Sequence, residues 1–176
     1  MKAYTFIELM MAIMLLAVIL LGGTAIFYQS LRSSGLSDVD LNMSSALRGT
    51  LSSMEKDIRF ARAEMVGTGI RDDCLVSGNT GYTGNSLTVL DIGGAETVYS
   101  LINDKIASTS AQTGSVTYLT PDSIKIKSLS FTWYCRGGVN DKINIEVDAS
   151  VTVLGSGLEV TRNVSTEVNM LNSGIN

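Results

Sequence analysis

The sequence begins with a long apolar segment, and this feature restricts the fold of the chain more than any other. Residues 4–28 contain a single charged residue, Glu8, within a run of aliphatic and aromatic residues. A helix of this length is long enough to cross a hydrocarbon core of about 30 Å. The segment therefore predicts a membrane-spanning helix.

A cleaved secretory signal is an alternative reading of the same segment. Such a signal has a basic region, then about 7–15 apolar residues, and then a cleavage site of the small-x-small type. Here the basic region is Lys2 alone, the apolar run starts almost at once, and no small-x-small site follows. We therefore favour a helix that stays part of the mature protein.

Charge and composition exclude several classes of function. The chain has 13 basic and 17 acidic residues, and only Lys2 and Glu8 fall within residues 1–31. The net charge of −4 argues against a surface that neutralises nucleic-acid phosphates. The absence of histidine excludes histidine-dependent triads and histidine-ligated zinc or haem. With only two cysteines and no P-loop or GxSxG motif, the sequence predicts a protein that is not an enzyme.

Glu8 needs a physical explanation because it lies inside the apolar run. An acidic residue at the centre of a membrane helix costs about 2.5–3.5 kcal/mol, and less near the helix end. Its carboxylate could reach the lipid headgroups, or it could pair with a positive charge inside an assembly.

Residues 4–10, with the sequence YTFIELM and the aliphatic run behind them, resemble the N-terminus of type IV pilins and type II secretion pseudopilins. In that family a prepilin peptidase removes a short basic leader, the new N-terminal residue is methylated, and glutamate is the fifth mature residue. The resemblance implies cleavage between Ala3 and Tyr4 and N-methylation of Tyr4. The residue before the cleavage site is usually glycine in the family, and here it is Ala3.

The same resemblance implies a role for Glu8. Cleavage would expose an ammonium group on Tyr4, and Glu8 of one subunit would neutralise Tyr4 of its neighbour in a filament core. Because an unpaired buried charge is heavily penalised, this salt bridge would check the register of assembly.

A helical pattern continues after the apolar run. Apolar residues recur every three or four positions and form one stripe: Leu36, Val39, Met43, Leu47, Leu51, Met54, Ile58, Ala61 and Met65. We expect this helix to end near Val66, before Gly67. A separate core helix behind a membrane helix fits these residues equally well, whereas the family resemblance favours one continuous helix that could bend at Gly35 or Gly49.

The pattern of the C-terminal part predicts an antiparallel sheet. We expect a loop over residues 67–84 and a hairpin at Gly93-Gly94 between strands 87–92 and 96–102. A short strand at 115–119 and a three-stranded meander over 124–170 follow, with a bulge near Lys127-Ser128. The odd-numbered apolar residues from Ile143 to Val153 alternate with polar ones, so their face should cover the helical stripe.

Together these patterns predict an α+β fold of pilin-like type, with a long N-terminal helix, apolar in its first half and amphipathic in its second, packed on an antiparallel sheet. The expected divisions are a leader at 1–3, a membrane or filament-core helix at 4–31, an amphipathic helix at 32–66 and a β-sheet domain at 67–176. Residues 51–61 and 160–168 resemble the J-type minor pseudopilins and W-type minor pilins, which lie near filament tips and help to start assembly.

Two further sets of residues are candidates for sites. Cys74 and Cys135 form a disulfide if this part of the chain lies outside the cytoplasm, and otherwise they are two buried thiols. Asp72-Asp73 and Asn140-Asp141 could bind calcium, as some pseudopilins do, but neither has the spacing of a calcium loop. We therefore expect solvated turns there and no cofactor.

The function that the sequence favours is a structural subunit of a pilus or pseudopilus, in a minor, initiating position. The resemblance implies insertion in the inner membrane with the N-terminus cytoplasmic and the C-terminal domain periplasmic, followed by incorporation into the filament. The implied partners are other subunits, the prepilin peptidase and the assembly platform. A major pilin, a minor pilin for DNA uptake and a membrane-anchored binding module that never polymerises stay open, as does the system served: secretion, motility, adhesion or uptake.

Overall fold

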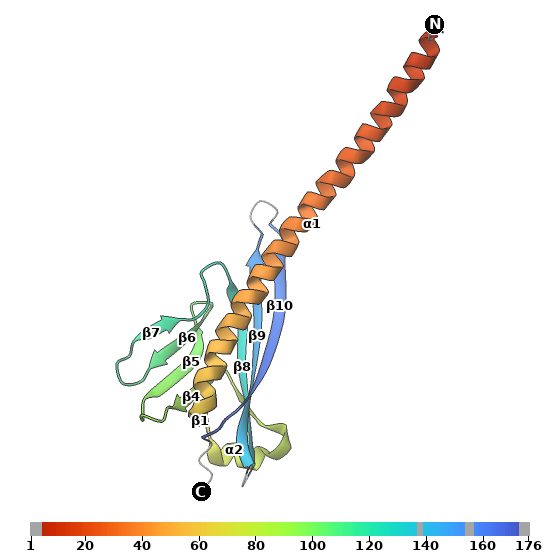
Figure 1. Cartoon of the computed structure of the whole chain (residues 1–176). Coiled ribbons are helices and arrows are strands. Elements are labelled where there is room, and N and C mark those ends of the chain that lie inside the picture. Colours follow the sequence, from red (N-terminus) through yellow and green to blue (C-terminus); the bar gives the residue numbers. More distant parts are fainter. Residues whose placement is uncertain (1–4, 137–138, 154–156, 173–176) are drawn as a thin grey trace. The chain divides into compact units, whose positions relative to one another are not determined.

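The computed structural model describes residues 5–136, 139–153 and 157–172. The chain forms two compact units, Met1–Asp40 and Leu41–Asn176. One α-helix, α1 (Phe6–Phe60), runs from the first unit into the second (Figure 1). It continues through Gly35 and Gly49, so the alternative with two separate helices is wrong and the continuous helix is confirmed.

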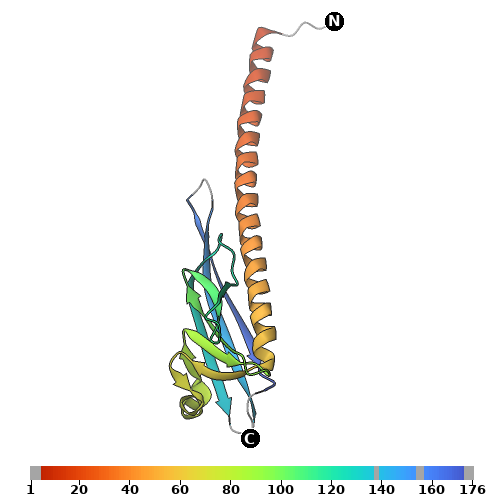
Figure 2. The same cartoon turned by 90° about the vertical axis from the view of Figure 1, so that its left-hand side faces the viewer.

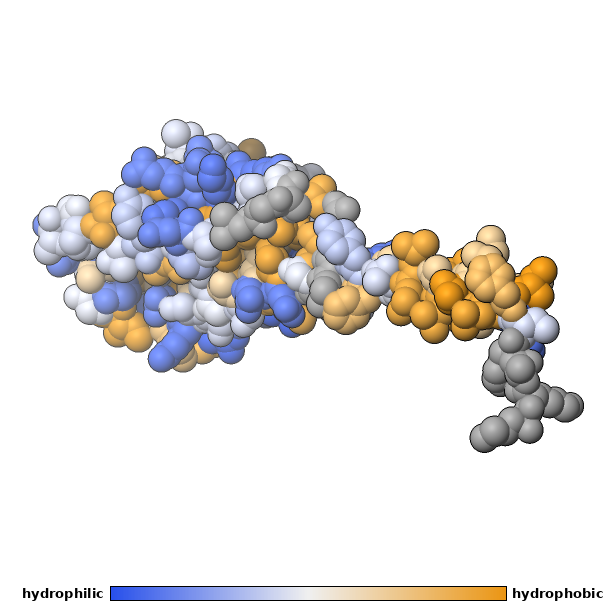
Figure 3. All heavy atoms as spheres, turned by 90° about the horizontal axis from the view of Figure 1, so that it is seen from above, coloured by the Kyte–Doolittle hydropathy of each residue, from blue (hydrophilic) through white to orange (hydrophobic). Residues whose placement is uncertain are grey.

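The first unit exposes its apolar side chains. From Phe6 to Tyr28 the large apolar residues keep between 55% and 77% of their surface accessible. Figure 3 shows this apolar surface, in orange, gathered over the N-terminal part of α1. By length and composition this part of the helix could cross a membrane, and none of it is buried by the chain itself.

The second unit contains two antiparallel sheets. The six-stranded sheet has the order β2-β1-β4-β5-β6-β7, and the four-stranded sheet has the order β10-β9-β8-β3. The strands are β1 (Arg62–Val66), β2 (Gly69–Ile70), β3 (Tyr82–Gly84), β4 (Ser86–Leu90), β5 (Glu96–Ile102), β6 (Lys105–Ser110), β7 (Val116–Tyr118), β8 (Lys125–Arg136), β9 (Val139–Thr152) and β10 (Glu159–Asn169). A short helix, α2 (Arg71–Ser77), and a 3-10 turn, η1 (Gly78–Thr80), connect β2 to β3. Helix and antiparallel sheets together give the expected α+β class.

The core lies between the second half of α1 and the β8–β9–β10 meander. The helical residues Met43, Leu47, Leu51, Met54 and Ile58 are buried in one cluster with strand residues Ile143, Ile145 and Val147. Figure 2 shows this part of α1 lying along one face of the meander. A lone amphipathic helix is marginal in water, so the sheet stabilises the helical stripe and the stripe covers the sheet.

The strand register agrees with the alternation in the sequence. Val147 pairs with Leu129 of β8 and Val164 of β10, and all three side chains face α1's side of the sheet. The predicted bulge is confirmed, because the register of β8 shifts between Ile126 and Ser128. The sequence Gly155-Ser156-Gly157 predicts a turn between the last two strands of the meander, but it lies mostly outside the described residues.

The helix end was predicted wrongly. α1 ends at Phe60 rather than near Val66, and Ala61 closes its last turn by donating a backbone hydrogen bond to Ile58. The next residues form β1, which pairs with β4. Ala61 and Met65 have helix-like spacing in the sequence, but the backbone of Arg62–Val66 pairs with β4 instead, and Met65 is 37% exposed.

The predicted loop over residues 67–84 is also wrong, since this segment contains β2, α2, η1 and β3. Its glycines allow close packing. A Cβ atom on Gly69 would lie 2.2 Å from the Tyr82 ring, and one on Gly84 would lie 2.6 Å from the backbone of Gly67. β6 was not foreseen either, because its hairpin with β5 turns at Asn103 and Asp104, both with positive φ, and contains no glycine.

Replacing Val147 by aspartate tests the assignment of the core face. Val147 is fully buried, so an unpaired carboxylate there should lower the free energy of unfolding by at least about 3 kcal/mol. Thermal melts of the full chain in detergent, followed by circular dichroism, provide the measurement. Glu146→Lys is the control, because Glu146 is exposed on the opposite face and the change should cost less than about 1 kcal/mol. Equal melting temperatures for the two variants would contradict the register.

Candidate functional site

The N-terminal motif is described only in part. Ala3 and Tyr4, the predicted cleavage and methylation positions, lie outside the described residues. Glu8 lies in the first turn of α1 and is exposed. Its backbone N–H donates to the Thr5 carbonyl oxygen at 3.1 Å, which satisfies one of the free donors at the helix start. The carboxylate is therefore available to a group from outside this unit.

The helical geometry places small and polar side chains on the same face as Glu8. Eighteen residues make five full turns, so Ile26 lies directly in line with Glu8. Ile26 borders a shallow groove that continues along this face, with Gln29, Ser30, Ser33, Ser37 and Asp38. Ala12, Leu15, Ile19 and Gly22 fall between Glu8 and this groove, on the same face. We call this set, from Glu8 to Ser37, the Glu8 face.

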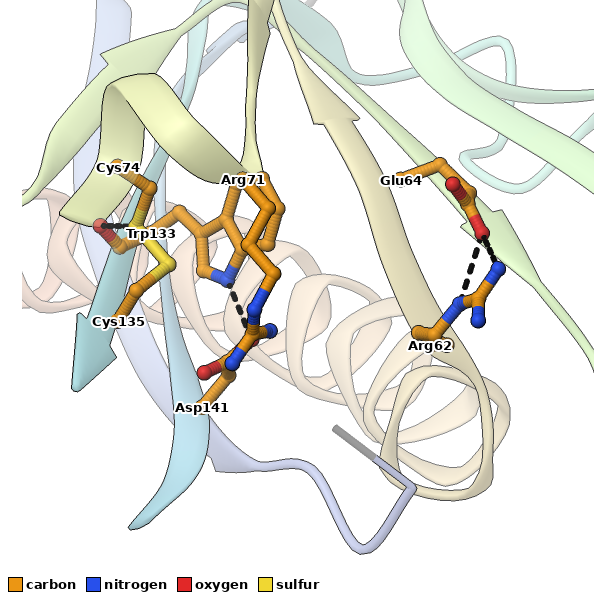
Figure 4. A network of polar contacts seen from close by, with 7 residues as sticks. All are labelled: Arg62, Glu64, Arg71, Cys74, Trp133, Cys135 and Asp141. Atoms are coloured by element: carbon orange, nitrogen blue, oxygen red, sulfur yellow. Dashed lines mark hydrogen bonds and ion pairs between the residues drawn. A yellow bond between two sulfur atoms is a disulfide. The ribbon is translucent and has the colours of Figure 1, made fainter. Parts of the chain in front are cut away.

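The expected disulfide is present between Cys74 and Cys135. It joins α2 to the end of β8, and both residues are buried (Figure 4). In the chain-entropy account, a cross-link that closes such a long loop adds about 4 kcal/mol to stability. α2 is thereby fixed against the four-stranded sheet.

A buried polar cluster lies next to the disulfide. Asp141 on β9 is 1% exposed, and its Oδ2 atom accepts hydrogen bonds from Arg71 Nη1 and, at 3.2 Å, from Trp133 Nε1 (Figure 4). Arg71 opens α2, so this ion pair ties α2 to β9 while the disulfide ties it to β8. Burial raises the pKa of the Asp141 carboxyl, and the Arg71 and Trp133 contacts partly offset the increase.

The expected solvated turns are wrong, because Asp72-Asp73 lies in α2 and Asn140-Asp141 lies in β9, with Asp141 buried. The contacts give two of these candidates structural roles. Asp73 Oδ2 accepts a hydrogen bond from the Ile70 N–H at 3.0 Å and so caps α2, and Asp141 pairs with Arg71. Within residues 5–136, 139–153 and 157–172, no three histidine, cysteine, aspartate or glutamate side chains come together in a way that could hold a metal ion.

Sequence reasoning missed the Arg71–Asp141–Trp133 cluster, although one signal for it exists. Asp141 has the same odd parity as Ile143, Ile145 and Val147, so the alternation directs it into the core. A buried carboxylate requires a charged or hydrogen-bonding partner. The alternation therefore indicates that Asp141 needs a partner. The partner is Arg71, 70 residues away, and only the folded chain identifies it.

Comparison of the chain with protein-family models, with curated proteins and with solved structures finds no match.

Replacing Arg71 by leucine should destabilise the protein most at neutral pH. The change leaves Asp141 charged and buried without its cation, so the free energy of unfolding should fall by about 2 kcal/mol or more at pH 7. Without Arg71 the folded-state pKa of Asp141 rises further, and a carboxyl with a raised pKa favours the folded state as pH falls. The deficit should therefore shrink between pH 7 and about pH 4.5.

Thermal melts of wild type and variant across this range provide the measurement. Arg62→Leu is the matched control, because Arg62 pairs with Glu64 on β1 and both side chains are more than a third exposed (Figure 4). Its loss should cost less than about 1 kcal/mol and show no such trend. A deficit for Arg71→Leu that is constant with pH would refute the role given to Asp141.

Proposed function

We propose that the protein is a pilin-like structural subunit. It is held in the inner membrane by the N-terminal part of α1, with the C-terminal domain in the periplasm, and is then packed into a type IV pilus-like or type II secretion pseudopilus filament. The observation that carries the proposal is a single helix, α1, that is apolar and uncovered in one half and forms the core of a folded domain in the other. The resemblance of the sequence YTFIELM at residues 4–10 to the N-terminus of pilins and pseudopilins supports the proposal.

The uncovered half of α1 requires an environment that the chain does not supply. Its large apolar side chains, from Phe6 to Tyr28, are all more than half exposed. Each buried aliphatic side chain is worth about 1.5–3 kcal/mol, so water is a poor environment for this segment. Lipid provides the cover before assembly, and the helices of neighbouring subunits provide it afterwards.

The Glu8 face supplies the contact between helices. Small residues such as Ala12, Gly22 and Ser33 allow two helix backbones to approach closely. Close packing matters in a membrane because lipid is as apolar as the side chains, so the hydrophobic effect does not drive helices together. Glu8 then lies within reach of the Tyr4 ammonium of a neighbour that is shifted by about one helical turn, roughly 5.4 Å. The two charges stabilise each other only in that register.

An initiating position in the filament rests on the second resemblance. Residues 51–61, in the buried half of α1 and just beyond its end, and residues 160–168, in β10, resemble the J-type and W-type minor subunits. The disulfide supports a location outside the cytoplasm, where such bonds persist.

Processing is tested by the mass of the mature protein. Cleavage between Ala3 and Tyr4 followed by N-methylation should remove the first three residues and add one methyl group. Intact-mass spectrometry of protein purified from membranes or filaments gives the answer directly. Retention of Met1 in assembled filaments would overturn the proposal.

Replacing Glu8 by leucine tests the assembly contact. The variant should insert in the membrane at least as well as wild type, because a charge has been removed from the apolar run. It should be processed normally and yet be absent from filaments, because the neighbour's Tyr4 ammonium loses its partner. Membrane fractionation and quantification of sheared filaments give the two readings.

Ile7→Leu is the matched control, since it changes the adjacent residue without altering charge and should assemble as wild type does. Filaments that contain normal amounts of Glu8→Leu subunits would show that the pairing is not needed.

A further inference from the structure

A cleft in the second unit is lined by both acidic and apolar side chains. It has a volume of about 490 Å³ and lies between the last turns of α1 and the β4–β5 hairpin. Asp57 and Asp91 contribute carboxylates to it, and Phe60 and Ile92 contribute apolar side chains. Tyr99 on β5 also lines it and is buried. The cleft thus combines negative charge with exposed apolar surface.

Both carboxylates are held in place by neighbouring groups. Asp57 Oδ2 accepts a hydrogen bond from the Tyr99 hydroxyl at 3.3 Å, and burial together with Asp57 raises the pKa of that hydroxyl, so it stays a donor. Asp91 Oδ1 accepts from the Ala95 N–H at 2.8 Å, which fixes the hairpin turn. Among the described residues neither carboxylate forms an ion pair, although Lys56 also lines the cleft.

The apolar residues Phe60 and Ile92 at the cleft are exposed and are not part of the hydrophobic core. Ile92 is 78% exposed in the turn that Asp91 fixes, and Phe60 is 49% exposed at the end of α1. Single exposed apolar residues are common, but here an aromatic and an aliphatic side chain line the same cleft and can contact one apolar group of a partner. Aromatic anchors of this kind supply much of the energy of protein–protein contacts.

We propose that this cleft docks an extended segment of a partner protein that carries a basic residue next to an apolar one. The basic group lies between Asp57 and Asp91, where a guanidinium can also stack on the Phe60 ring. The apolar side chain packs against Phe60 and Ile92. This contact is separate from the Glu8 face and does not depend on the proposed function.

Peptide selection on the full chain in detergent tests the docking chemistry. A random heptapeptide library displayed on phage is selected against wild type, and a synthetic peptide with the enriched consensus is then used as the probe. The consensus should hold lysine or arginine within one position of an apolar residue. Binding of this probe should weaken by about tenfold in the Asp57→Asn/Asp91→Asn double variant in 50 mM salt. The loss should be smaller in 300 mM salt, because salt screens the attraction between the carboxylates and the basic group.

The asparagine side chains keep both hydrogen bonds, with Tyr99 and with the Ala95 N–H, so the fold should be unaffected. The double variant Asp72→Asn/Glu146→Gln is the control of equal charge change, because both side chains are exposed and lie outside the cleft. It should leave binding within about twofold. Ile92→Ser should also weaken binding. The proposal is overturned if no consensus emerges, if the consensus lacks a basic residue, or if the double variant binds the probe as wild type does.

Discussion

The structure depends on one helix whose two halves need different environments. In the first half of α1 apolar side chains surround the helix, and the chain offers them no cover, whereas in the second half a single stripe from Met43 to Ile58 is buried by the sheet. The change from all-round to one-sided apolarity separates a segment that needs lipid or neighbouring helices from one that is stabilised by its own domain. The scarcity of charged residues in the first half of α1 agrees with this division.

Two tertiary contacts hold α2, a helix that contributes little to the hydrophobic core. The segment between β2 and β3 is short and glycine-rich, and hydrophobic burial alone gives α2 little stability. Two independent ties compensate: the Cys74–Cys135 disulfide to β8 and the Arg71–Asp141 ion pair to β9. Disulfides persist in oxidising compartments, so the bond is consistent with the proposed periplasmic location.

Periodicity in the sequence predicted the parts of the fold that are governed by burial of one face. The stripe on α1 and the alternation along β9 are of this kind, and both lie in the core as expected. Periodicity could not predict the end of α1, because Arg62–Val66 leaves the helix for long-range pairing with β4. Nor could it pair Asp141 with Arg71, since only the folded chain brings them together. Of the candidate site, the sequence predicted the disulfide, and the role of Glu8 stays a prediction. The cleft at Ile92 depends on tertiary structure.

The central claim is that subunits contact each other through the Glu8 face of α1. Oxidative cross-linking between single cysteines introduced into the apolar helix tests it most directly, because the two native cysteines are already joined to each other. Ile19 lies on the Glu8 face, three turns from Glu8, and Ala17 lies on the opposite face. The account predicts cross-linked subunits for Ile19→Cys and none for Ala17→Cys in assembled material. Equal cross-linking at both positions, or none at either, would contradict it.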